Sequence, residues 1–214
     1  MNMKRRPPIL RLLSQVAFLV LFMALLKMKR PTNWMIVFVA SALLSAAFSR
    51  FYCGWICPIN TSMQVSEVIG RKLKIQKRHV PAVLKSGIAS YLMLGVTLVL
   101  AFLNITGRVK LPFVAIMTAA GFLVTLRYTQ AVWHNYLCPY GVILRLPSRF
   151  ARFRMSVGHE CIPGCDKCAR VCPAESVTIG SQRADIDSSL CLVCQKCAMV
   201  CPTHTIAYRR SGAR

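Results

Sequence analysis

The chain has 214 residues, of which 55% are hydrophobic and 16% are charged, and its formal net charge at pH 7 is +22. A soluble nucleic-acid-binding protein would not be this apolar, and a disordered basic tail would not be apolar at all, so neither class fits. Residues 1–158 carry 21 of the 28 basic residues and a single acidic residue, Glu67. This split predicts two domains, a membrane domain at residues 1–158 and a nearly charge-balanced domain at residues 159–214.

Four uncharged apolar stretches occupy the first domain, at residues 12–26, 31–49, 86–107 and 111–126. We expect each to span a lipid bilayer, with Arg11 and Arg127 snorkelling to extend the two shorter ones. The alternative is four core helices of a soluble protein, but the chain lacks the polar faces that would cover them. The expected fold class is therefore an α-helical membrane protein with four transmembrane helices.

Basic residues are distributed unequally between the two sides that this topology creates. The side with both termini and the middle loop has 16 of them, whereas the opposite side has five, which are Lys27, Lys29, Arg30, Arg108 and Lys110. By the positive-inside rule, both termini and the second domain are expected to face the cytoplasm of a bacterium. The predicted location is the bacterial cytoplasmic (inner) membrane, as a multi-pass protein whose partner is the lipid bilayer.

The second domain contains eight of the eleven cysteines in two similar motifs, at residues 161–173 and 191–202. The second motif is C-x2-C-x2-C-x3-C-P, the spacing by which bacterial ferredoxins bind iron–sulfur clusters. A zinc site would need two C-x2-C pairs and would leave the third cysteine and the Cys-Pro unexplained. If the pair binds as in two-cluster ferredoxins, one [4Fe-4S] cluster takes Cys161, Cys165, Cys168 and Cys201. The other takes Cys191, Cys194, Cys197 and Cys172.

The first motif has one residue more between its first two cysteines than the second motif has. Pro163 and Gly164 are expected to absorb this residue in a turn. Residues 176–179, 184–186 and 205–208 are predicted to be short strands. The second domain is thus expected to be a small α+β ferredoxin-like module with two [4Fe-4S] clusters.

The other three cysteines and one histidine form a repeated pattern behind the second and fourth apolar stretches. Cys53 and Cys57 precede Pro58, whereas His134 and Cys138 precede Pro139, and the offset between the two pairs is 81 residues. The membrane domain therefore resembles one helical hairpin used twice, which would bring the four side chains together as a third cluster or metal site at the membrane edge. The alternative is structural, with buried thiols at helix starts and a hydrogen-bonded core histidine.

The motifs Cys-Gly-Trp-Ile-Cys-Pro and Leu-Cys-Pro-Tyr-Gly, joined to a tandem ferredoxin motif, resemble the NapH/MauN type of membrane-bound ferredoxin-like protein. That group is related to the membrane cores of NosR and the CcoG/RdxA proteins. The resemblance covers roughly residues 12–208. It implies [4Fe-4S] binding and electron transfer at the cytoplasmic membrane, often from quinol toward a periplasmic reductase. The chain departs from the group at His134, where the second motif usually begins with cysteine.

The function expected from these features is that of an iron–sulfur electron carrier. It would move electrons between the quinone pool and a membrane-anchored or cytoplasmic redox protein. The alternative is an assembly factor that reduces a metal ion, such as copper, for another enzyme, and a redox sensor or structural subunit is a third class. The sequence contains no C-x-x-C-H haem motif and no nucleotide-binding fingerprint.

Overall fold

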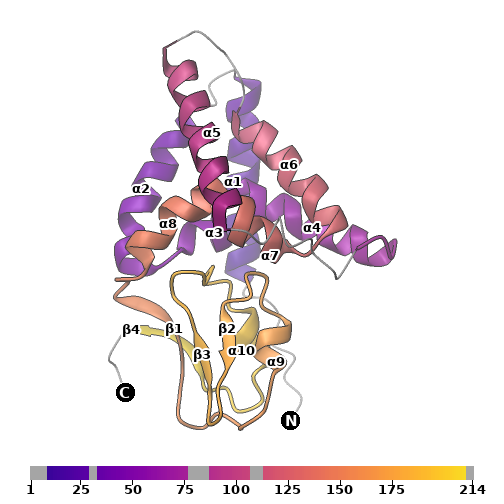
Figure 1. Cartoon of the computed structure of the whole chain (residues 1–214), viewed down its shortest axis with the longest axis vertical. Coiled ribbons are helices and arrows are strands. Elements are labelled where there is room, and N and C mark those ends of the chain that lie inside the picture. Colours follow the sequence, from indigo (N-terminus) through magenta and orange to yellow (C-terminus); the bar gives the residue numbers. More distant parts are fainter. Residues whose placement is uncertain (1–8, 29–32, 77–86, 107–112, 211–214) are drawn as a thin grey trace. The chain divides into compact units, whose positions relative to one another are not determined.

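The computed structural model of the chain describes residues 9–28, 33–76, 87–106 and 113–210. The chain divides into two compact units. The first unit consists of Met1–Ala17, Phe38–Ile56 and Leu144–Arg214, and the second consists of Phe18–Val37 and Cys57–Ile143. The described part is mostly helical, and its strands lie in the C-terminal part of the chain (Figure 1).

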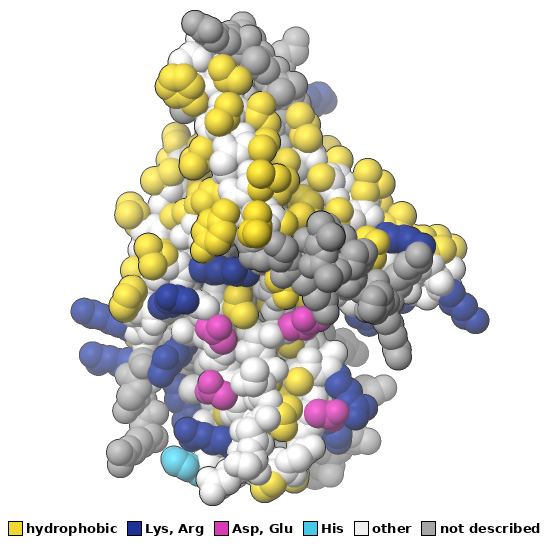
Figure 2. Space-filling model, in the orientation of Figure 1, with side chains coloured by type: hydrophobic (Ala, Val, Ile, Leu, Met, Phe, Trp, Pro, Cys, Tyr) yellow, Lys and Arg dark blue, Asp and Glu magenta, His cyan; other side chains and the backbone are white. Residues whose placement is uncertain are grey.

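A helix lies in each of the four apolar stretches, as predicted. They form α1 (Ile9–Lys27), α2 (Asn33–Phe48), α5 (Gly87–Ile105) and α6 (Phe113–Arg127). Among the described residues, α1 alone is long and apolar enough to cross a membrane, and the other three are shorter apolar helices over the part whose side chains are described. On the face drawn in Figure 2, hydrophobic side chains cover the helices, whereas the acidic side chains belong to the strand-containing part.

Many of the basic residues behind the predicted orientation lie outside the described residues. They are Lys4, Arg5, Arg6, Lys29, Arg30, Lys77, Arg78, Lys85, Arg108 and Lys110. The number of spans and the orientation therefore stay predictions.

Helices α4 (Pro58–Lys72) and α6 pack closely in the second unit because small residues line their contact. The Ser66 hydroxyl donates to the carbonyl of Phe122 at 2.6 Å. A Cβ at Gly70 would lie 2.6 Å from the carbonyl oxygen of Leu126, so only glycine fits there. This contact holds the C-terminal half of α4, the helix that begins at the first Cys-Pro motif.

The two Cys-Pro motifs have the same local structure. Each follows an apolar helix and a short helical segment, and each proline begins a new helix. The elements of the first copy are α2, α3 (Phe51–Trp55) and α4, and those of the second are α6, α7 (Gln130–Val132), the π-helix η2 (Trp133–Leu137) and α8 (Pro139–Ser148). The carbonyls of Cys57 and Cys138 accept hydrogen bonds from the amides of Thr61 and Val142, respectively, at 3.2 and 3.3 Å. Thr61 and Val142 are again 81 residues apart, so the repeat extends to the backbone.

The cysteine-rich part of the first unit is a small α+β module (Figure 1). Its elements are β1 (Phe153–Val157), α9 (Lys167–Arg170), β2 (Val177–Ile179), β3 (Ala184–Ile186), α10 (Lys196–Val200) and β4 (Ile206–Arg210). Strands β2 and β3 form an antiparallel hairpin, as expected. Strand β4 pairs antiparallel with β1, from Phe153 opposite Arg210 to Val157 opposite Ile206. The sequence did not predict β1, because arginines precede it and lie inside it.

Candidate functional site

The eight C-terminal cysteines line two separate cavities in the module, four to each. One cavity is lined by Cys161, Cys165, Cys168 and Cys201. The other is lined by Cys172, Cys191, Cys194 and Cys197. We call these the first and second cysteine sets. Each set takes three side chains from one motif and the fourth from the other motif, which is the grouping that a two-cluster ferredoxin would have.

A tight turn accommodates the additional residue of the first motif, as expected. The amide of Cys165 donates to the carbonyl of Ile162 at 3.2 Å, and Gly164 between them has a φ of +74°. Proline in the second position and glycine in the third fit a type II turn, in which the third residue needs positive φ. The turn therefore returns Cys165 to the cavity despite the longer spacing.

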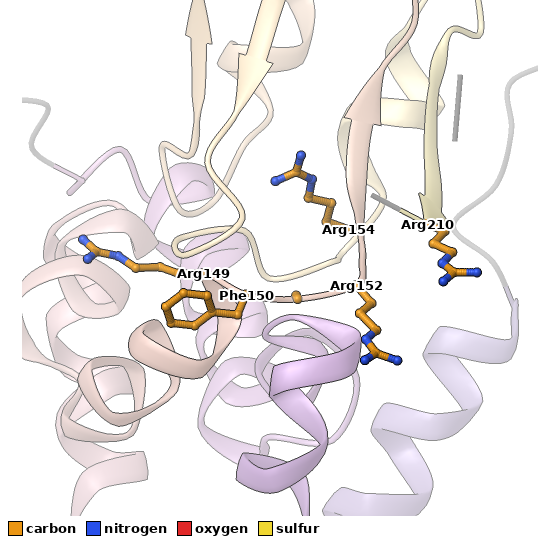
Figure 3. A pocket seen from close by; sticks show the side chains of 6 residues that line it. Arg149, Phe150, Arg152, Arg154 and Arg210 are labelled. Carbon is orange, nitrogen blue, oxygen red and sulfur yellow. The ribbon is translucent and has the colours of Figure 1, made fainter. Parts of the chain in front are cut away.

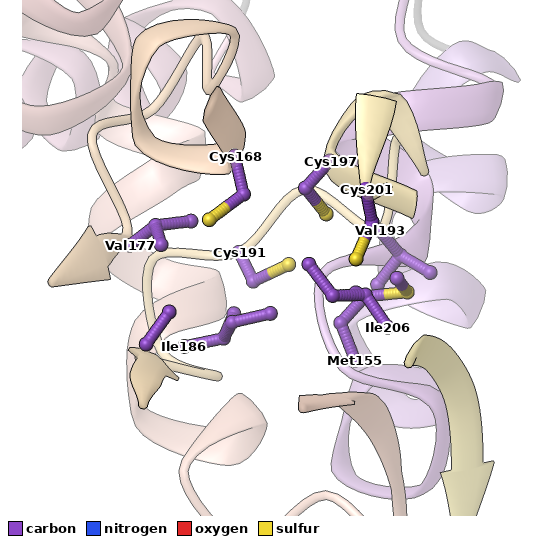
Figure 4. Packing of buried hydrophobic residues seen from close by; sticks show 10 residues of the cluster. Met155, Cys168, Val177, Ile186, Cys191, Val193, Cys197, Cys201 and Ile206 are labelled. Atoms are coloured by element: carbon purple, nitrogen blue, oxygen red, sulfur yellow. The ribbon is translucent and has the colours of Figure 1, made fainter. Parts of the chain in front are cut away.

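The thiols lie among apolar side chains that exclude water. Figure 4 shows Cys168, Cys191, Cys197 and Cys201 turned into the interior among residues such as Ile186. Burial raises the pKa of Cys191 to about 12, and it also raises the pKa of Cys197. Because a metal ion binds the thiolate, such thiols give up their protons only when a cation replaces them.

Two thiols receive hydrogen bonds from neighbouring residues. The amide of Ser176 donates to Sγ of Cys172 at 3.4 Å. At Cys201, burial acts to raise the pKa, but hydrogen bonds from Thr203, Thr205 and Ile206 outweigh it and lower the pKa. Hydrogen bonds to sulfur are one of the means by which a protein sets the potential of a cluster.

The described residues contain no group of three or more His, Cys, Asp or Glu side chains placed to hold a single metal ion. A [4Fe-4S] cube binds each of its four thiolates to a different iron, so its ligands stand farther apart than those of one ion. The two cysteine sets have the donor chemistry for the cube.

Three of the four residues predicted for the membrane-edge site lie in the second unit. Cys57, His134 and Cys138 are all buried, and Nε2 of His134 lies 3.2 Å from Oδ1 of Asn60. Burial raises the pKa of Tyr140, and the nearby thiolates of Cys138 and Cys57 raise it further, so both thiols lie near one phenol. Cys53 is also buried but belongs to the first unit.

Two arginines that the charge count treated as ordinary basic residues are buried in the first unit. Arg11 is 4% exposed and donates to the carbonyls of Gly54 and Cys194, so the expectation that it snorkels is wrong. Arg50 is 0% exposed and donates to the carbonyls of Ser189 and Leu190. A buried arginine was not predictable here because its partners lie up to 183 residues away.

The first unit also contains an apolar cavity of about 380 Å³ beside α3. Its lining includes Leu44 and Phe48 of α2, Tyr52 of α3 and Tyr208 of β4. The Tyr208 hydroxyl donates to the carbonyl of Phe48 at 3.0 Å, which ties the end of α2 to the module. A cavity of this size and apolar lining can hold a small apolar ligand.

A basic surface lies where α8 leads into β1. Arg149, Arg152, Arg154 and Arg210 surround Phe150, whose side chain is 76% exposed. Figure 3 shows the four guanidinium groups splayed in different directions instead of converging. The arrangement is therefore a basic surface with an exposed aromatic ring and lacks the convergence of a single-anion site.

Comparison with known proteins finds two iron–sulfur families, which match three segments of the chain. Residues 31–76 and 111–158, which contain the Cys-Pro motifs, match a family described as a 4Fe-4S binding domain. Residues 184–207 match a second family with the same description.

Several curated proteins are similar to the chain at low identity. It is 28% identical to the ferredoxin-type protein NapH of Haemophilus influenzae, over 68% of this chain and 55% of NapH. It is 28% identical to the methylamine utilization ferredoxin-type protein MauN of Methylobacillus flagellatus, over 60% of this chain and 50% of MauN. It is 23% identical to the putative electron transport protein YccM of Escherichia coli K12, over 65% of this chain and 46% of YccM. The chain thus spans about half the length of these relatives, and no solved structure matches it.

Proposed function

Because the chain is similar to the ferredoxin-type proteins NapH and MauN and matches 4Fe-4S binding families, we propose that it is an integral iron–sulfur electron-transfer protein of the bacterial cytoplasmic membrane. The observation that carries the proposal is the division of eight cysteines between two cavities of four. Sets of four thiols suit four-cysteine clusters, and the C-x2-C-x2-C-x3-C-P spacing of the second motif favours iron–sulfur clusters over zinc.

Each cysteine set would hold one [4Fe-4S] cluster. A bound cluster supplies a site that gains and loses one electron. The protein supplies four thiolates, an apolar wall and hydrogen bonds from Ser176 and Thr203 to Cys172 and Cys201, respectively. The first set contains the more exposed thiols, Cys161 and Cys165, whereas three members of the second set are buried. Solvent exposure is one factor that sets the reduction potential of a cluster, so the two sets would differ in reduction potential.

The proposal places four helices, as two repeated hairpins, in the bilayer with both termini in the cytoplasm. Large apolar side chains on all four are exposed, including Leu12 at 57%, Ile36 at 71%, Ile88 at 78% and Leu123 at 64%. Contact with lipid tails would be favourable for such apolar surfaces, whereas contact with water would be unfavourable. The basic surface around Phe150 has the composition of a cytoplasmic interface, where arginine meets anionic headgroups and an aromatic ring anchors the chain.

A third redox or metal site would be formed by Cys53, Cys57, His134 and Cys138. The support is the 81-residue repeat, the burial of all four side chains and the shared neighbourhood of Cys57 and Cys138. Imidazole in place of one thiolate raises the potential of an iron–sulfur centre. Such a centre would accept electrons more readily than the two cytoplasmic ones.

We propose a quinone or quinol as the small-molecule partner and the apolar cavity beside α3 as its site. The cavity adjoins α2 and is lined by Phe48, Tyr52 and Tyr208, whose aromatic rings suit a quinone ring. A membrane-anchored or cytoplasmic redox protein would be the other partner.

The test is to add a reduced quinol analogue to the full chain in lipid and to follow bleaching of the cluster absorbance. Leu44→Trp should fill the cavity and slow bleaching at least tenfold. The control is Leu43→Trp on the same helix, because Leu43 is 75% exposed and does not line the cavity. If no cluster exchanges electrons with quinol while reduced clusters rapidly convert Cu(II) to Cu(I), the assembly-factor function replaces this one.

A further inference from the structure

The segment around Cys53 holds the loop of the second cysteine set through direct contacts with its backbone. Nε1 of Trp55 donates to the carbonyl of Val193 at 3.0 Å. The Ser49 hydroxyl donates to the carbonyl of Ser188 at 3.0 Å. Each bond joins two residues that lie far apart in the sequence, by 138 and 139 positions, within the first unit. The loop that carries Cys191 and Cys194 therefore lies against the Cys-Pro segment.

Glycine is required at the centre of this contact. A Cβ at position 54 would overlap the carbonyl oxygen of Leu192 and lie 3.2 Å from its carbonyl carbon. Across the contact, Val193 has a φ of +52°, a left-handed conformation that costs a β-branched residue free energy. Val193 is only 1% exposed, and its carbonyl accepts the Trp55 bond, so the packing holds this conformation in place.

Arg11 connects the two sides of the contact. Its Nε donates to the carbonyl of Gly54 at 3.1 Å, and its Nη1 donates to the carbonyl of Cys194 at 2.9 Å. Gln15, one turn later on α1, donates to the same Gly54 carbonyl at 2.9 Å. A buried guanidinium thus lies directly on the backbone of a second-set cysteine.

Arg50 places a second buried charge at the same loop. It donates to the carbonyls of Ser189 and Leu190 at 3.4 and 3.5 Å, and its Nη2 lies 3.9 Å from Sγ of Cys53. The two ion pairs found among the described residues, Glu67 with Arg71 and Asp166 with Arg170, involve neither Arg50 nor Arg11. A buried cation without a carboxylate is costly unless another negative charge lies nearby. Four thiolates around iron would supply that charge.

We propose that Arg11 and Arg50 are positioning residues that hold the loop of the second cysteine set on the Cys53 segment and raise the reduction potential of a cluster bound there. Electrons would therefore pass between the membrane segment and the module through the second set, with the first set farther along the route. This inference rests on the proposed function, because it assumes that both sets hold iron. Reduction adds negative charge, so two fixed positive charges favour the reduced state of the nearer cluster.

The experiment is a potentiometric titration of the full chain followed by electron paramagnetic resonance. The signal of the second set is identified as the one that Cys194→Ser removes. In Arg11→Met, the ratio of reduced to oxidised second cluster at a fixed ambient potential should fall about tenfold, which is 59 mV for one electron. The first signal should titrate unchanged. Arg183→Met is the matched control, because Arg183 is an exposed arginine of the same unit outside these contacts.

A second variant separates charge from position. Arg11→Lys keeps the charge but loses the two-pronged hydrogen bonding, so its second cluster should keep nearly the wild-type potential. Equal shifts of both signals in Arg11→Met, or no shift, would overturn the inference. If Arg11→Met loses the iron of the second set alone, the positioning role is supported. If it loses all iron, Arg11 serves the fold in general and the inference fails.

The outcome for the proposed function is measured separately. If the wild-type chain binds no iron, the proposed function itself is wrong. If it binds iron and exchanges electrons with quinol, the second signal should appear before the first on rapid mixing. The opposite order would overturn the route while leaving the proposed function standing.

Discussion

Replacement of Gly54 by alanine should abolish the cluster of the second cysteine set and leave that of the first set intact. The new methyl group would overlap the carbonyl oxygen of Leu192, and the loop backbone must move by about 1 Å to restore normal contact. Overpacking of this kind costs about 1–3 kcal/mol. The movement also stretches the bonds that Arg11 and Trp55 make to the loop, and a hydrogen bond from a charged donor contributes roughly 1.5–3 kcal/mol. We expect a total cost of about 2.5–6 kcal/mol at this contact.

The assay is iron content per chain together with quantified paramagnetic signals after reduction. Gly54→Ala should lose about four iron atoms and the signal of the second set, because each cube contains four irons. The first signal should remain, since none of the atoms nearest the new methyl group belongs to the first set.

Gly95→Ala is the matched control for this substitution. Gly95 lies in α5 and has no atom within 4 Å of an added Cβ. Alanine there should be neutral or slightly stabilising, by up to about 1 kcal/mol, because glycine is a poor helix former. If Gly54→Ala keeps both signals and the wild-type iron content, the loop does not depend on close approach at this glycine.

Other predictions concern the remaining sites. Cys165→Ser should remove the signal that Cys194→Ser leaves, as checked by paramagnetic resonance of each variant; loss of both signals in either variant would contradict two separate sets. Cys138→Ser should abolish a third centre and leave about eight irons in the module, measured by iron analysis; iron content equal to wild type would mean that this thiol is structural. Reporter fusions after residues 80 and 214 should both be active only in the cytoplasm; periplasmic activity at 214 would overturn the orientation.

The parts of the molecule that were predictable from sequence are those fixed by local chemistry. Cysteine spacing limits how a loop can surround a cluster, so the motifs predicted, for a two-cluster ferredoxin, the grouping of Cys161 with Cys201 and of Cys191 with Cys172. The turn at Gly164 followed from a Pro-Gly pair that needs positive φ. Four uncharged stretches indicated four helices, since apolar character over this length is itself a helical signal.

The parts that were not predictable depend on contacts between distant segments. Arg11 seemed to be an ordinary flanking charge, and only its bond to Cys194 shows why it is buried. Strand β1 follows a basic segment and contains Arg154, and its pairing with β4 decides its conformation. The five-residue π-helix before Cys138 has no sequence signal in a single chain, although π-helical turns are frequent at functional sites.

The pairing of β1 with β4 has a consequence for biosynthesis. Strand β4 begins at Ile206, so β1 has no partner until the ribosome has made about 50 further residues. The first cysteine set is likewise incomplete until Cys201 has been translated, because its fourth member comes from the second motif. During that interval the nascent chain carries up to seven module thiols with one set still open. A cluster at the first set can therefore have all four thiolate ligands only after residue 201 has been made, and a translational pause before it would expose those thiols to oxidation and to competing metals.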